Sequence, residues 1–184
     1  KIIKTKVEVP KAFYIPAQYT QVLDVLAIQG VTVEPVNKAT NMTLTQGEIV
    51  AHQFASVPFE GRFRVAPDLR YQRSELLLDE RWLKVSTAQP LGLLATHILH
   101  PEAPDSLLQW GFFHTLFQRT EYVENYALEP YAKTLLAEDV ALAEQYNEKL
   151  KEPAFAQDAD ARRAWLYANS PYYDQQFLRY PILM

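Results

Sequence analysis

The chain has 184 residues, of which 48% are hydrophobic and 22% are charged, and its formal net charge at pH 7 is −4. These values are ordinary for a folded globular protein, and the length is sufficient for one domain with a substantial core. Lys and Arg are scattered rather than clustered, which argues against non-specific binding to nucleic acid.

The sequence also argues against cysteine-based sites and membrane-spanning helices. It contains no cysteine, so disulfides, thiolate zinc sites and cysteine nucleophiles are ruled out. No apolar run approaches the roughly 20 residues of a membrane-spanning helix, so we expect no membrane span.

The N-terminal region predicts a strand–helix–strand unit. Residues 12–16 are apolar and rich in strand-forming side chains, and residues 18–29 place apolar side chains at helical spacing. Gly30 is expected to end the helix, because glycine adopts positive φ at little cost. Residues 31–36 form a second strand, parallel to the first because the helix returns the chain across the sheet.

Apolar and polar residues alternate imperfectly over residues 42–87, which indicates antiparallel strands with one solvent-facing side. Turn-forming residues interrupt this pattern at 46–47, 58–61, 67–68 and 79–80. We expect the last of these turns to join residues 74–78 and 82–87 as a hairpin.

After residue 90 the pattern becomes mostly helical. Helices are predicted over 91–99, 130–137 and 139–150, and from Asp158 or Asp160 to about Asn169, with Asp139 as an N-cap. The sequence therefore predicts an α+β fold in a single domain. Its N-terminal α/β plus β part covers residues 1–90, and its helical part covers residues 91–184.

A series of short motifs runs through the chain in a fixed order. The second half contains Gln89–Gly92, His100–Ser106, Trp110–Phe113 and Ser170–Asp174, and the first half contains Pro10–Pro16, Gly30–Val33 and Pro58–Gly61. In this order the motifs resemble the segment that follows the catalytic domain in a group of bacterial zinc carboxypeptidases of the M14 family. The resemblance spans nearly the whole chain.

The resemblance implies a parent protein that is a zinc metallocarboxypeptidase, periplasmic or extracellular, which releases C-terminal residues from peptides. Its zinc ligands would lie upstream of Lys1. In this family the first two ligands come from a His-x-x-Glu pair, and no histidine of this chain is followed by Glu at the third position. We therefore expect a non-catalytic C-terminal accessory domain without a cofactor of its own. It would pack on and support the upstream catalytic domain, and peptide substrate is a further possible partner.

A second interpretation is a stand-alone module that binds peptides or glycans. Glu60 and Arg62 flank a turn glycine and could shape a binding edge, while Trp110, Tyr172 and Tyr173 could form an exposed aromatic platform. The alternative for the charged pair is a structural ion pair at the surface. For the aromatic residues the alternative is burial in the core.

Two catalytic constellations are weaker alternatives. His97 and His100 with Glu102 could ligate a metal ion, but histidine in a last helical turn also suits the negative end of the helix dipole. Asp105, Ser106 and His114 are the residue types of a hydrolase triad, but Asp105 or Ser106 fits better as an N-cap. The glycines never cluster, so no phosphate-binding loop is predicted.

Overall fold

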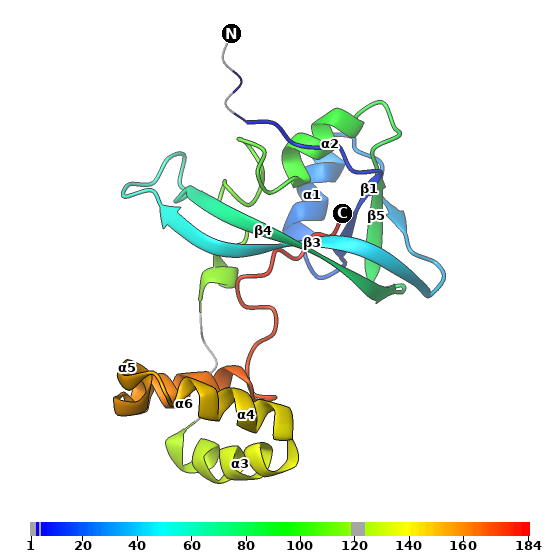
Figure 1. Cartoon of the computed structure of the whole chain (residues 1–184). Helices are drawn as coiled ribbons and strands as arrows, with labels where there is room; N and C mark the ends of the chain where they lie inside the picture. Colours follow the sequence, from blue (N-terminus) through cyan, green and yellow to red (C-terminus); the bar gives the residue numbers. More distant parts are fainter. Residues whose placement is uncertain (1–2, 4, 119–123) are drawn as a thin grey trace. The chain divides into compact units, whose positions relative to one another are not determined.

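A computed structural model describes residues 3, 5–118 and 124–184. The predicted α+β class is confirmed, with antiparallel strands and with helices mostly in the C-terminal half. The elements are β1 (Ala12–Pro16), α1 (Thr20–Ile28), β2 (Glu34–Pro35), β3 (Thr40–Phe54), β4 (Val65–Leu78), β5 (Trp82–Ser86), α2 (Gly92–Leu99), the 3₁₀ helix η1 (His114–Phe117), α3 (Asn125–Glu138), α4 (Val140–Lys149), α5 (Pro153–Gln157) and α6 (Ala159–Ala168) (Figure 1).

The chain divides into two compact units. Unit 1 comprises residues 1–118 and 176–184, and unit 2 comprises residues 119–175. Neither boundary falls near residue 90, where the sequence pattern changes from mixed to helical, because α2 and the turns that follow it pack into unit 1. In the described part of the chain, no helix combines the length and the hydropathy needed to cross a bilayer.

Unit 1 contains a small sheet and a long two-stranded ribbon. The sheet has the order β1-β5-β2, with β5 antiparallel to both neighbours, so β1 and β2 run parallel as the sequence predicts but do not pair. Gly30 ends α1 with a φ of 76°, as predicted. The second strand is shorter than expected and contains only Glu34 and Pro35.

The ribbon corrects two of the predicted turns and the predicted hairpin. β3 passes through residues 46–47 and β4 passes through residues 67–68 without a turn, and the two strands pair along their whole length with one register shift between Ile49 and Ala51. Residues 79–80 do form a turn, but β4 and β5 do not make a hairpin. Both edges of β5 are occupied by β1 and β2, so β4 pairs with β3 instead.

β1 is buried on both faces because its side chains alternate between two clusters. Phe13 and Ile15 join the main core with α1, α2 and β5, whereas Ala12 and Tyr14 pack with Leu44 and the base of the ribbon. β1 therefore connects the small sheet to the ribbon.

The C-terminal segment 178–184 completes this connection. The backbones of Tyr14 and Leu183 exchange hydrogen bonds of 2.9 and 3.0 Å, and those of Thr45 and Met184 exchange bonds of 2.7 and 2.9 Å. Tyr180 donates from its backbone N to the Gly47 carbonyl at 2.8 Å. A Cβ on residue 47 would lie 3.2 Å from the Leu69 side chain, which explains why glycine occupies an uninterrupted strand here.

Unit 2 is a group of four helices, α3 to α6, with contacts of α3 with α4 and α6, and of α5 with α6. Asp139 and Asp158 cap α4 and α6 through their side chains, as the sequence indicates. The prediction that a helix starts at Pro130 is wrong, because α3 begins at Asn125 and contains the proline. The buried hydrophobic residues of unit 2 are Leu128, Ala132, Leu142, Phe155 and Tyr167.

Candidate functional site

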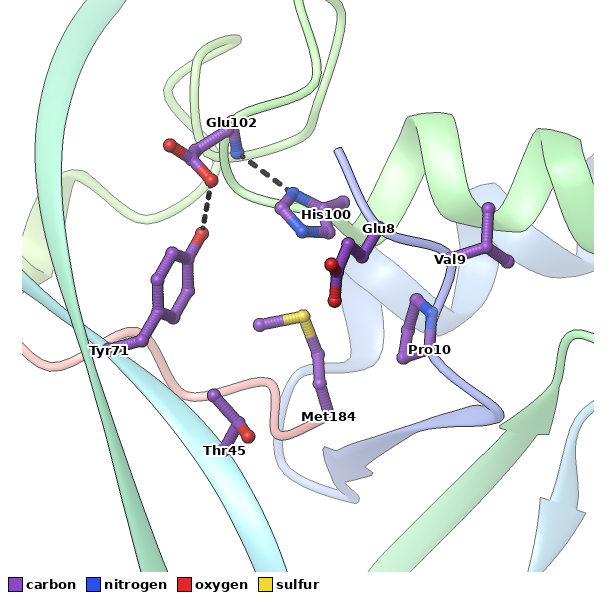
Figure 2. A pocket seen from close by; sticks show the side chains of 8 residues that line it. All are labelled: Glu8, Val9, Pro10, Thr45, Tyr71, His100, Glu102 and Met184. Carbon is purple, nitrogen blue, oxygen red and sulfur yellow. Dashed lines mark hydrogen bonds between the residues drawn. The ribbon is translucent and has the colours of Figure 1, made fainter. Parts of the chain in front are cut away.

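A cavity in unit 1 lies beside the imidazole of His100 (Figure 2). It has a volume of about 400 Å³, within the range of small-molecule sites. Its lining comes from four separate parts of the chain: the segment before β1, the ribbon, the residues after α2, and the C-terminal segment. We call it the His100 pocket, and its lining residues are Glu8, Val9, Pro10, Thr45, Tyr71, His100, Glu102 and Met184.

His100 is held at the end of α2. Its backbone N donates to the Thr96 carbonyl at 2.9 Å, and Pro101 follows it, so the helix stops there. The His100 side chain is only 5% exposed. Its Nδ1 accepts a hydrogen bond of 3.3 Å from the backbone N of Glu102, which places the proton of a neutral imidazole on Nε2.

The electrostatic environment favours that neutral form. Burial lowers the pKa of His100 below its ordinary value, and the Glu102 carboxylate only partly opposes this effect. In the described part of the chain, Nε2 makes no hydrogen bond. His100 is therefore a largely buried residue whose Nε2–H donor has no protein partner in the described residues, although this atom itself remains accessible to solvent.

Tyr71 and Glu102 form the opposite side of the pocket. The Tyr71 hydroxyl donates to Oε2 of Glu102 at 2.8 Å. Burial raises the pKa of Tyr71, and the bond to the Glu102 carboxylate raises it further, so the hydroxyl stays protonated. Oε1 of Glu102 has no hydrogen bond with the described residues. Figure 2 shows this carboxylate and that of Glu8 on either side of His100.

A second candidate lies at the free end of the ribbon. Glu60 and Gly61 both have positive φ, 49° and 77°, and Phe59 pairs with Arg62 across them. This is the geometry of a two-residue hairpin turn. We define the hairpin-tip surface as five apolar or aromatic residues at this end. They are the exposed Phe54, Val57, Phe59 and Phe63 and the half-buried Trp110.

Arginine side chains and ring contacts hold this surface together. The Arg64 guanidinium lies 4.7 Å from the centre of the Trp110 ring, and Arg62 lies 3.9 Å from that of Phe112. Phe59 packs on Trp110 with ring centres 5.8 Å apart. The Trp110 Nε1 donates to Asp105 at 3.3 Å. The segment after α2 therefore supports the free end of the ribbon.

The residues predicted from the sequence for a binding edge divide between the two units. Glu60 and Arg62 lie in the turn at the free end of the ribbon in unit 1, and Trp110 packs on the neighbouring Phe59. Tyr172 and Tyr173 belong to unit 2. Tyr172 is exposed and lies 5.2 Å from the Tyr131 ring, while Tyr173 is half-buried and lies 5.5 Å from the Tyr167 ring.

The predicted catalytic alternatives do not assemble in the described residues. Ser106 Oγ donates to the Pro101 carbonyl at 3.2 Å, and His114 Nε2 lies 2.8 Å from the Phe63 carbonyl, so these residues do not form a triad with Asp105. His97 is exposed while His100 is buried. Across residues 5–118 and 124–184, no group of three or more His, Cys, Asp or Glu side chains is placed to hold a metal ion.

The sequence does not predict the His100 pocket as a cavity. His100 and Glu102 are close in the chain, but Glu8, Tyr71 and Met184 reach them only through the fold. No local sequence pattern predicts that these five residues lie close together in the fold.

Comparisons of this chain with protein-family models, curated proteins and solved structures found no match. The resemblance to the M14 family therefore rests on the sequence motifs alone.

Proposed function

We propose that this chain is a non-catalytic accessory domain of an M14-like zinc metallocarboxypeptidase, and that its hairpin-tip surface packs on the catalytic domain. The motif order supports the choice of family. The observation that carries the packing role is the group of exposed apolar side chains at the free end of the ribbon.

These side chains are largely accessible to solvent. The exposed fractions are 68% for Val57, 54% for Phe59 and 45% for Phe63. An exposed cluster of large apolar side chains marks an interaction surface more often than scattered single residues do. Burying the cluster against another domain would remove apolar area from water and stabilise both partners.

The composition of the surface also fits an interface. Aromatic residues and arginine are enriched at the centres of protein interfaces. Here Arg62 and Arg64 lie over aromatic rings, so their charged groups are already positioned. A two-stranded ribbon is marginal by itself in water, and a partner domain against its free end would hold it in place.

By the resemblance, the zinc ion and its ligands belong to the catalytic domain, which would act on the C-terminal ends of peptides in the periplasm or outside the cell. The accessory domain would support that domain and wall one side of its substrate cleft. The Glu60–Gly61 turn lies next to Phe59 of the hairpin-tip surface, between the paired residues Phe59 and Arg62, and we favour it for this wall.

The test is to isolate the native polypeptide from its source cells with an antibody raised against this chain, and to measure its mass and zinc content. We expect a polypeptide much larger than the 21.2 kDa of this chain, with stoichiometric zinc and carboxypeptidase activity. A polypeptide of this chain's own mass, without zinc, would overturn the proposal.

One observation favours the binding-module alternative. An open pocket of about 520 Å³ lies beside the free end of the ribbon, and both polar and apolar residues line it. Its lining includes Gln53, Phe54, Val57, Arg64 and Gln109. A peptide or glycan that binds the isolated chain, and that Gln109→Ala and Phe54→Ala release, would support this alternative.

A further inference from the structure

The structure also assigns a ligand class to the His100 pocket: we propose that it binds a small amine with a neighbouring hydroxyl group, that is, an amino alcohol or an amino sugar. This inference does not rest on the accessory-domain proposal, because it uses only the residues that line the pocket.

The charge of the pocket selects the amine. Glu8 and Glu102 contribute carboxylates, and among the described lining residues there is no Lys or Arg to neutralise them. Oε1 of Glu102 is open, and the Glu8 side chain is exposed at the pocket edge. A primary ammonium group donates several hydrogen bonds and carries the opposite charge, so it complements a pocket lined by two carboxylates.

His100 selects the neighbouring oxygen. The residue as a whole is more than nine-tenths buried, its Nδ1 is already bonded to the Glu102 backbone, and its Nε2 is open to solvent. The remaining Nε2–H is a donor that lacks an acceptor in the described residues. An ammonium group cannot accept this bond, but a hydroxyl oxygen on an adjacent carbon can. A carboxylate oxygen is disfavoured because it would lie among the two acidic side chains.

The remaining walls suit a carbon skeleton. The Tyr71 ring, Val9, Pro10 and the Met184 side chain supply the apolar part of the pocket lining. Tyrosine offers an apolar ring face for the C–H groups of a sugar while its hydroxyl stays bonded to Glu102. The pocket volume accommodates a single sugar ring.

The chain contains only two methionines, which makes a direct test possible. Met184 lines the pocket, whereas Met42 packs against the second apolar cluster at the base of the ribbon. With ¹³C-methyl-methionine labelling, the Met184 signal reports on the pocket and the Met42 signal reports on the fold. The buffer should be phosphate, because Tris is itself an amino alcohol.

Titration with glucosamine should shift the Met184 signal saturably and leave the Met42 signal in place. Glucose and N-acetylglucosamine, which lack the ammonium group, should bind at least about tenfold more weakly. Equal dissociation constants for glucosamine and glucose would overturn the proposal, as would the absence of a saturable shift with glucosamine.

Two variants remove one carboxylate each without changing side-chain size. Glu102→Gln and Glu8→Gln should each weaken glucosamine binding by about tenfold, while Glu75→Gln, an exposed change on β4 outside the pocket, should leave it unchanged. An unaltered Met42 signal shows that a variant is folded. Unchanged binding in both folded pocket variants would contradict the assignment.

Discussion

The hydroxyl of Tyr180 donates a hydrogen bond of 2.8 Å to the backbone carbonyl of Leu99, and both groups are buried. This bond ties the C-terminal segment to the end of α2, immediately before His100. The bond therefore connects the core of unit 1 to the residue that precedes His100, which lines the pocket.

Tyr180→Phe should lower the free energy of unfolding by about 1–2 kcal/mol, because it leaves the Leu99 carbonyl buried without a donor. Urea denaturation of the 184-residue chain measures the change. Tyr126→Phe is the matched control, since Tyr126 is exposed. Equal stabilities of the two variants would show that the buried bond contributes nothing.

Two glycines, Gly47 and Gly92, lack a positive φ, and alanine should lower the stability of the chain more at Gly92 than at Gly47. A Cβ at residue 92 would lie 1.9 Å from the Thr87 carbonyl oxygen, so the turn between β5 and α2 would have to move. We expect a loss of about 3 kcal/mol or more in the free energy of unfolding.

Gly61→Ala provides the comparison at an open site. A Cβ there meets nothing within 4 Å, and only the positive φ of 77° opposes it. The expected cost is about 1 kcal/mol. If denaturation shows Gly61→Ala to be the worse of the two, the close packing of Gly92 on Thr87 is incorrect.

The stability of the chain should fall as the pH is lowered through the ordinary histidine pKa of 6.5. Burial lowers the pKa of folded His100, so the unfolded chain takes up a proton at a higher pH than the folded chain does. The stabilisation that His100 contributes is fully present above its pKa in the unfolded chain. It is lost as the pH falls towards the pKa of His100 in the folded chain.

His100→Asn should flatten this part of the pH profile, whereas His97→Asn, at an exposed site on α2, should leave it unchanged. Urea denaturation across the range from neutral to mildly acidic pH measures both slopes. A profile that is identical in the wild-type chain and in His100→Asn would rule out the role of His100.

Unit 2 depends on two side-chain caps. The Asp139 carboxylate accepts from the Leu142 backbone N at 2.9 Å, and Asp158 accepts from Asp160 and Ala161 at 2.9 and 3.0 Å. Asp139→Ala and Asp158→Ala should each destabilise the helices by about 1 kcal/mol. Thermal unfolding followed by circular dichroism measures the loss, and Glu144→Ala, at an exposed position on α4, is the control. A cap variant that melts at the same temperature as the control would contradict the prediction.

Local sequence signals predicted the elements that are determined locally. The helix stop at Gly30, the caps at Asp139 and Asp158, and the turn at Glu60–Gly61 all depend on the conformational preferences of one or two residues. These preferences act in the same way wherever the segment lies in the fold.

The errors occurred where distant segments decide the outcome. Gly47 looks like a turn residue, but the approach of Tyr180 and Leu69 from elsewhere in the chain keeps it in a strand. The turn at residues 79–80 suggests a hairpin, but β1 and β2 already occupy both edges of β5. The His100 pocket could not be predicted for the same reason, since Glu8, Tyr71 and Met184 meet only after folding.

The packing of the hairpin-tip surface on a catalytic domain can be measured by hydroxyl-radical footprinting of the isolated chain and of the native polypeptide. The account predicts that oxidation of Phe59, Phe63 and Trp110 is severalfold slower in the native polypeptide. Ile28 and Leu93, which are exposed apolar residues on α1 and α2 outside this surface, serve as internal references. Equal oxidation of the three tip residues in both samples would contradict the account.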